Sequence, residues 1–122
     1  KFMIWSNFLY VGLGGMLGSV LRYWVGCLIP ATWFPMGTLT VNLIGSFVLG
    51  ALTGLAAKSH LSPTLLLLLG TGLCGGFTTF STFSNEVLIL IQSAKWTTVI
   101  GYVIASVLGG LVFAWLGYIF FK

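Results

Sequence analysis

The sequence predicts an all-α membrane protein with four transmembrane helices, on the evidence of its charge, its composition and the spacing of its charges. Only six of the 122 residues are charged, 5% of the chain, and 58% are hydrophobic. The charges leave uncharged runs of 20, 35, 27, 8 and 26 residues. Because about 20 apolar residues cross a bilayer as a helix, roughly four spans fit and no water-soluble domain remains. We therefore expect a multi-pass protein of the cell membrane and no enzyme.

The four spans form a single domain, residues 1–122, and breakers or caps bound each of them. The first covers about residues 6–29, too long for the apolar core of a signal peptide, and ends at Pro30. The second covers about 38–57, and we expect Thr38 to cap it. Ser62 followed by Pro63 predicts the start of the third, about 63–91. The fourth covers 97–121.

Small residues recur three or four positions apart in several spans. Such faces let helix backbones approach closely in lipid, where no hydrophobic force drives helices together. We expect most of the following to be packing residues: Gly14 and Gly18; Gly45, Ser46, Gly50 and Gly54; Gly101, Ser106, Gly109 and Gly110. We also expect both cysteines, Cys27 and Cys74, to be buried as small apolar side chains.

The five basic residues are divided almost evenly between the two sides of the membrane. Lys1, Lys58 and Lys122 belong to the side of the termini, Lys95 to the other, and Arg22 lies inside the first span, nearer the opposite face. Orientation follows an excess of basic residues, and here there is almost none. We predict that copies insert in both orientations; a weak preference for one is the alternative. Because the basic residues form no patch, nucleic-acid binding is excluded.

The third span holds the least helix-like sequence, GLCGGFTTFSTFSNE at residues 72–86. As one straight helix, residues 63–91 measure about 43 Å, more than the hydrocarbon core. We predict a helix break near the bilayer centre, which offers free carbonyls to a cation and a helix N-terminus with its positive dipole end. The alternative is an unbroken helix whose hydroxyls bond to their own backbone.

Other polar or aromatic side chains at membrane depth are candidate functional residues, because burying polarity in lipid is costly. Asn42 suits either helix association or contact with an anion through its NH₂ group. Phe80 and Phe83 share a helix face, and their positive ring edges attract anions. Further candidates are Ser81, Thr82, Tyr102 and Ser106 as hydroxyl donors, Arg22 as a vestibule charge, and Glu86, which we expect to hydrogen-bond near the interface.

These segments together resemble the Fluc (CrcB) fluoride channel family over nearly the whole chain. The matching segments are GGMLGSVLRY at residues 14–23, GTLTVN at 37–42 with GSF at 45–47, and GGFTTFSTF at 75–83. The third segment is highly specific. The resemblance implies an antiparallel dual-topology homodimer with two narrow fluoride pathways and a sodium ion at the dimer interface.

The resemblance also assigns roles to residues. It implies that Asn42 donates to the anion and that Phe80 and Phe83 line the path with ring edges. It implies that the backbone carbonyls of Gly75 and Thr78 bind sodium. The polar track would comprise Ser81, Thr82, Tyr102 and Ser106, and one turn further on Gly110 carries no donor.

The function expected from the sequence is passive, fluoride-selective conduction out of the cytoplasm. Fluoride is small and strongly hydrated, so a pore must replace its water with hydrogen-bond donors. No nucleotide motif is visible, and the first span has no carboxylate for proton coupling. Two alternatives remain: an ion-coupled small-solute transporter, for which only Glu86 could titrate, and a non-conducting membrane assembly subunit in which the polar residues hold helices together.

Overall fold

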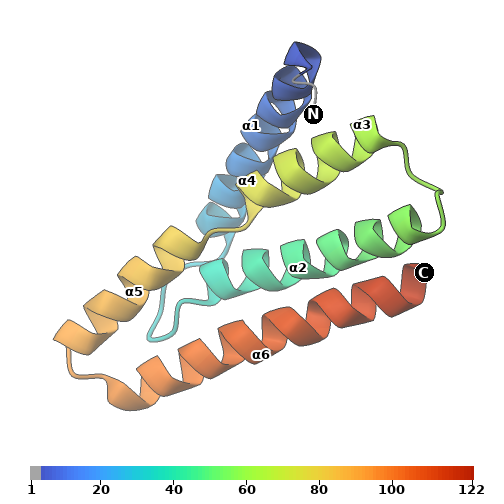
Figure 1. The fold of residues 1–122 in the computed structure, drawn as a ribbon. Helices are drawn as coiled ribbons and strands as arrows, with labels where there is room; N and C mark the ends of the chain where they lie inside the picture. The colour runs from blue at the N-terminus through green and yellow to red at the C-terminus, as the bar shows by residue number, and fades with distance from the viewer. Residues whose placement is uncertain (1–3) are drawn as a thin grey trace.

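The structure, a computed structural model, describes residues 4–122 and is entirely helical apart from its loops. Lys1 of the charge count lies outside the described residues. The helices are α1 (Trp5–Leu28), α2 (Met36–Ala57), α3 (Pro63–Leu65), the π-helical η1 (Leu66–Cys74), α4 (Gly75–Phe77), α5 (Phe80–Gln92) and α6 (Trp96–Phe121) (Figure 1). Four stretches are long and apolar enough to cross a membrane, and α3, η1, α4 and α5 together form the third.

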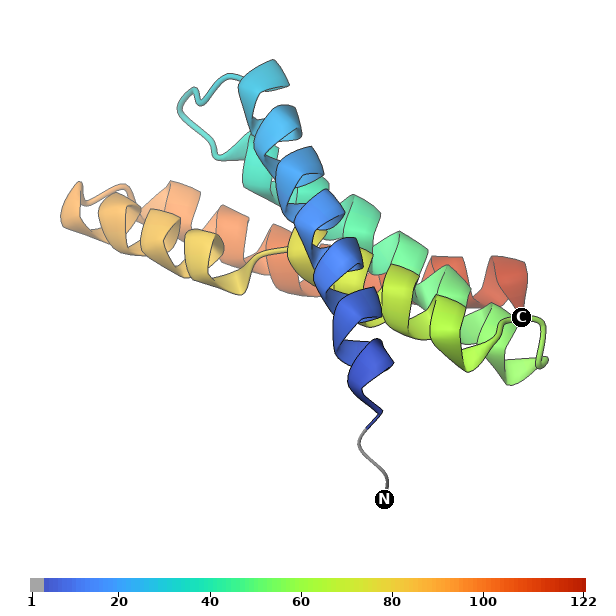
Figure 2. The same cartoon turned by 90° about the horizontal axis from the view of Figure 1, so that it is seen from above.

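Two of the four spans run parallel to each other, the third runs antiparallel to them, and the first crosses the third. Helices α2 and α6 run side by side in the same direction, and the third span runs back along them (Figure 1). Helix α1 crosses the first half of the third span at a steep angle, which the view from above shows (Figure 2). The break in the third span therefore lies where α1, α2 and the two half-helices meet.

Glycines make both main helix contacts possible. At the crossing, a Cβ on Gly14 would lie 2.8 Å from the Leu73 backbone nitrogen, and one on Gly18 would lie 2.8 Å from that of Phe77. Between the paired helices, a Cβ on Gly50 would overlap the Ala114 carbonyl. Backbones packed this closely leave no room for side chains, as the small-residue pattern predicts. Gly101 is an exception, because nothing lies within 4 Å of its Cβ position.

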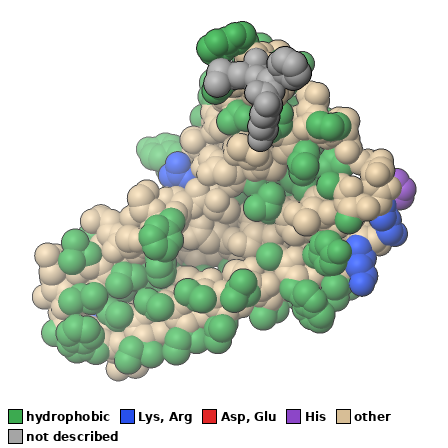
Figure 3. Space-filling model, in the orientation of Figure 1, with side chains coloured by type: hydrophobic (Ala, Val, Ile, Leu, Met, Phe, Trp, Pro, Cys, Tyr) green, Lys and Arg blue, Asp and Glu red, His purple; other side chains and the backbone are tan. Residues whose placement is uncertain are grey.

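Little of the apolar surface is buried within the chain. The buried hydrophobic residues are Leu39, Val41, Leu52, Cys74, Val99 and Tyr102. Hydrophobic side chains cover much of the surface, and Lys or Arg side chains lie beside the single histidine at the end where α2 and α6 finish (Figure 3). Cys74 is buried as expected, but the same expectation for Cys27 is wrong: its side chain is exposed on α1. Such a surface suits lipid or another membrane protein as its environment.

The capping predictions have different outcomes. Ser62 caps the third span as expected, since its hydroxyl accepts a hydrogen bond from the Leu65 backbone N–H and Pro63 occupies the first turn. The expectation that Thr38 caps the second span is wrong. That helix already begins at Met36, because Pro35 supplies the preceding turn, and Thr38 is a buried residue inside it.

The third span is broken within the predicted stretch, but after the double glycine. Gly75 is still helical, with φ −61° and ψ −38°, whereas Thr78 and Thr79 are extended. The alternative of an unbroken helix is therefore wrong. One hydroxyl of the third span does bond to its own backbone, since the Thr78 hydroxyl donates to the Cys74 carbonyl at 2.9 Å. The chain then restarts as α5 at Phe80.

Candidate functional site

The extended Thr78–Thr79 segment is held in place by Asn42 on α2. The Thr79 N–H donates to the Asn42 Oδ1 at 2.8 Å, and the Asn42 Nδ2 donates to the Thr79 carbonyl at 3.1 Å. These two bonds satisfy the backbone N–H and C=O of Thr79, which the break removes from the helix ladder. An amide carries two N–H groups, so one remains for another acceptor. Asn42 thus joins helices and keeps a free donor.

Both half-helix ends at the break have side-chain partners. The Thr79 hydroxyl accepts from the Thr82 backbone N–H at 3.2 Å, which caps α5, and also contacts the Thr82 hydroxyl at 3.1 Å. The Ser81 hydroxyl lies 3.4 Å from that of Thr79. On the other side, the Arg22 Nε donates to the Gly76 carbonyl at 3.0 Å. Arg22 therefore reaches the break from α1.

A cavity of about 280 Å³, the inner cavity, lies between α2, α6 and the break. The residues that line it are Asn42, Gly45, Ser46, Leu49, Thr78, Thr79, Phe80, Phe83, Ser106 and Val107. Among the residues that the structure describes, no charged side chain lines it. Its polar groups are one amide and several hydroxyls, which can donate hydrogen bonds to an anion without neutralising its charge.

The inner cavity has two features that an anion could use. The Phe80 and Phe83 ring centroids are 5.8 Å apart with planes inclined at 44°, and Phe80 is 79% exposed. The Ser106 hydroxyl oxygen is buried and has no hydrogen-bond partner within residues 4–122. A buried hydroxyl without a partner is costly unless a ligand or water satisfies it.

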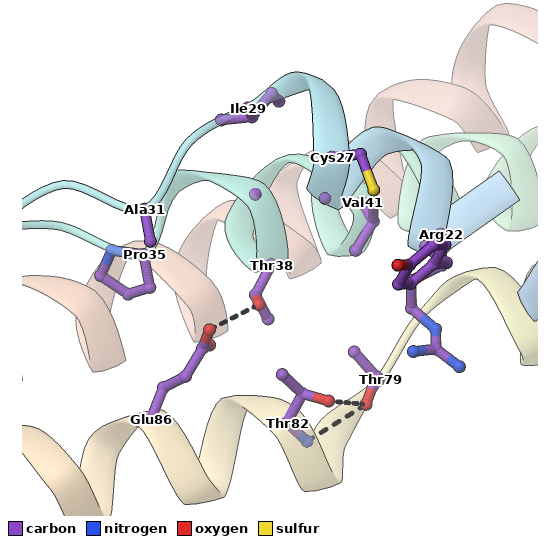
Figure 4. A pocket seen from close by; sticks show the side chains of 13 residues that line it. Arg22, Cys27, Ile29, Ala31, Pro35, Thr38, Val41, Thr79, Thr82 and Glu86 are labelled. Atoms are coloured by element: carbon purple, nitrogen blue, oxygen red, sulfur yellow. Dashed lines mark hydrogen bonds between the residues drawn. The ribbon is translucent and has the colours of Figure 1, made fainter.

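A second cavity of about 320 Å³, the outer cavity, lies between α1, α2 and α5 and carries charge. Arg22 and Glu86 line it from opposite sides, with Cys27 above and Thr79 and Thr82 below (Figure 4). Thr79 lines both cavities, so the break forms the wall between them. The Arg22 guanidinium places positive charge in this cavity.

Glu86 is hydrogen-bonded through both carboxylate oxygens. The Thr38 hydroxyl donates to Oε2 at 2.9 Å, and the Tyr102 hydroxyl donates to Oε1 at 2.7 Å. The fully buried Tyr102 ring also packs edge-on against Phe83, with centroids 5.0 Å apart. The expected hydrogen-bonding role of Glu86 is confirmed. The bond from Thr38 to Glu86 is not evident from the sequence, because a hydroxyl near an expected helix start resembles a helix cap.

The carbonyl oxygens of Gly75 and Thr78 have the chemistry of a cation site. Within residues 4–122, the hydrogen bonds of the structure pair neither oxygen with a donor, because the Thr79 N–H turns to Asn42. Gly75 is exposed at the surface of the chain. Free carbonyls at a break are the groups that bind sodium in membrane proteins, so the residues present fit such an ion.

The structure distributes the predicted site residues over two cavities and their walls. Asn42, Phe80, Phe83 and Ser106 line the inner cavity, whereas Arg22 and Thr82 line the outer one. Tyr102 and Ser81 line neither. Tyr102 is one turn before Ser106 on α6, but its hydroxyl proton is donated to Glu86. Four residues predicted for the anion pathway, together with Thr78, therefore belong to the ten that line the inner cavity.

Comparison with known proteins gives consistent matches. Residues 9–118 match the model of the CrcB-like protein family, Camphor Resistance (CrcB). A fluoride-specific ion channel FluC of Gloeobacter violaceus is 51% identical over 113 residues, 89% of this chain and 90% of the relative. One of Shewanella frigidimarina is 46% identical, covering 92% and 93%. A fluoride-specific ion channel FluC 1 of Bacillus cereus is 43% identical, covering 91% and 84%.

Proposed function

The chain belongs to the CrcB-like family, and on that premise we propose that it is a fluoride-specific ion channel of the cell membrane. It is a channel and not an enzyme, and it conducts fluoride passively out of the cytoplasm, which lowers fluoride toxicity. The bilayer is its environment, with four apolar helices as spans.

The observation that carries the proposal is the uncharged donor set of the inner cavity. Fluoride gives up strongly bound water on entering a narrow pore, and donors must replace that water. The free N–H of Asn42 and the unpaired Ser106 hydroxyl supply donors, and the Phe80 and Phe83 rings supply positive edges. Because no carboxylate among residues 4–122 lines this cavity, none of them repels the anion there.

Fluoride efflux from liposomes tests this function. Purified protein is reconstituted in vesicles loaded with fluoride or with chloride, and release is followed with an ion-selective electrode. We expect rapid fluoride release and chloride release at the rate of protein-free vesicles. Folded protein that leaves fluoride trapped would contradict the channel function and favour a non-conducting subunit.

Glu86 separates a channel from a coupled transporter. Both of its carboxylate oxygens accept hydrogen bonds, from Thr38 and from Tyr102, which gives the side chain a structural role between helices. We expect Glu86→Gln to conduct fluoride with less than about a threefold change, because the amide retains one acceptor. For both proteins, an imposed proton gradient should leave the fluoride flux unchanged. If the gradient drives fluoride accumulation in the parent and this accumulation disappears in Glu86→Gln, the protein is a coupled transporter.

We further propose that the channel is an antiparallel, dual-topology homodimer with two fluoride pathways. One protomer leaves Phe80 79% exposed and most of its apolar surface unburied, which a second copy could cover. Of the basic residues that the structure describes, Lys58 and Lys122 end α2 and α6, whereas Lys95 precedes α6 at the opposite end. This weak bias gives inverted copies similar probabilities of insertion.

Labelling from outside the cell tests the dual topology. His60, an exposed loop residue next to the second span, is replaced by cysteine in a chain lacking Cys27 and Cys74. An impermeant thiol reagent applied to intact cells should label about half the copies, as two equal populations require. Labelling of all copies or of none contradicts dual topology, and lysed cells provide the full-labelling control.

Sodium at the dimer interface is the last part of the proposal. The Gly75 and Thr78 carbonyls of each protomer would hold it, since neither has a hydrogen-bond donor among the described residues. A bound cation would supply fixed positive charge near the membrane centre. We expect the detergent-solubilised dimer to melt at a higher temperature in sodium chloride than in choline chloride, because binding to the folded state stabilises it. Equal melting temperatures would contradict the sodium site.

A further inference from the structure

Helices α2 and α6 are packed in a constant register beyond the inner cavity. Gly50 contacts the backbone of Ala114, and Gly54 contacts that of Tyr118, so each α2 residue lies level with the α6 residue 64 positions later. The same register places Asn42 level with Ser106 and Ser46 level with Gly110. Successive levels are one helical turn apart, about 6 Å.

On the α6 face that carries Ser106, the next two turns have no hydroxyl, and Ser46 of α2 lies beside the first of these turns. One turn past Ser106, Gly110 has no side chain, and one turn further on Ala114 has no donor. The Ser46 hydroxyl oxygen lies 3.7 Å from the Cβ position of Gly110. No hydrogen bond of this hydroxyl is found within residues 4–122. Ser46 therefore presents a donor at the level where α6 lacks one.

A third cavity, the exit cavity of about 290 Å³, continues from this level toward the ends of both helices. Its lining residues are Ser46, Leu49, Gly50, Thr53, Ala114 and Tyr118. Ser46 and Leu49 line the inner cavity as well, so these two residues form the junction. Thr53 donates its hydroxyl to the Leu49 carbonyl at 2.9 Å. The free donor at the junction is thus Ser46.

We propose that Ser46 donates a hydrogen bond to fluoride as the ion passes from the inner cavity to the exit cavity. The path then leaves α6 after Ser106 and continues along α2, and Ser46 takes the place of the hydroxyl that Gly110 lacks. The exit cavity lies next along this path and is lined by the hydroxyl-bearing side chains of Thr53 and Tyr118 as well as by apolar residues. This inference rests on the proposed fluoride conduction.

Three variants test the role of Ser46 in the liposome assay. Ser46→Ala should lower fluoride flux roughly tenfold, the effect of one lost hydrogen bond to a charged group. Adding Gly110→Ser to it should restore flux to within about threefold of the parent, because a Cβ there makes only ordinary contact at 3.7 Å and Gly110 has no positive φ. Thr40→Val is the control on the same helix. Thr40 lines none of the three cavities, so this variant should conduct fluoride at the parent's rate.

The outcomes separate this inference from the proposed function. If the parent conducts fluoride and Ser46→Ala conducts equally well, the role of Ser46 is wrong and the channel function stands. Reduced flux that Gly110→Ser fails to restore, with the dimer intact by size-exclusion chromatography, also contradicts it. If the parent itself retains fluoride, the proposed function fails and the inference fails with it.

Discussion

The outer and inner cavities lie on opposite sides of one residue, Thr79, and differ in how they could treat an anion. The outer cavity combines the Arg22 guanidinium with the Glu86 carboxylate, whereas hydroxyls, one amide and two phenyl rings line the inner cavity. A charged vestibule attracts ions at a distance, but a strong charge deep in the path would hold a fluoride ion too tightly for conduction.

The difference indicates that the outer cavity attracts the ion and that the inner cavity replaces its water. Attraction of a fluoride ion from solvent depends on charge, so salt screens it. Replacing the water of the ion depends on short hydrogen-bond contacts, which salt does not screen. Substitutions in the inner cavity should therefore reduce conduction strongly at any ionic strength. Those in the outer cavity should have smaller effects that salt diminishes.

Asn42→Asp should have the largest effect, because it changes the inner cavity from neutral to negative. The carboxylate keeps the bond from the Thr79 N–H but loses the bond to the Thr79 carbonyl and the free N–H. We expect fluoride flux to fall by about 100-fold or more, since two hydrogen bonds are lost and a like charge is added. Loss of the dimer on size-exclusion chromatography would show that Asn42 serves helix association instead.

Phe80→Leu tests the ring edges of the inner cavity and should have an intermediate effect. Leucine fills much of the same volume but has no positive edge, so we expect roughly a tenfold lower flux with an intact dimer. Phe120→Leu is the matched control, because Phe120 is similarly exposed, at 68%, and lines none of the three cavities. Equal flux in both variants would mean that Phe80 serves only packing.

Arg22→Gln tests the outer cavity and should have the smallest effect. Glutamine can still donate a hydrogen bond near the Gly76 carbonyl but removes the charge. We expect roughly a three- to fivefold loss of flux at low salt and little loss at 1 M salt, where the Debye length falls to about 3 Å. A loss of flux that does not depend on salt would mean that Arg22 serves to hold the break through its bond to Gly76. In that case Arg22→Lys, which keeps the charge, should conduct as poorly as Arg22→Gln.

The residues that hold the break illustrate how far the sequence could predict the site. The stretch at 72–86 predicts a break because its composition is unfavourable for a membrane helix, and the structure has one there. The position of the break was not predictable from composition, since glycine tolerates helix in a membrane and Gly75 remains helical. Thr78 and Thr79 are extended, and Asn42, 37 positions before Thr79, pairs with the backbone N–H and C=O of Thr79.

The sequence by itself determined the membrane class, the four spans and the residue types available to an anion. These follow from local properties, namely the length of apolar runs, the scarcity of charge and the positions of polar side chains. Only the tertiary structure decided which polar groups are free. It directs Tyr102 and Thr38 to Glu86, leaves Ser106 unpaired and sets Ser46 opposite Gly110. Hydrogen bonds between helices depend on packing register, which the closest backbone contacts determine.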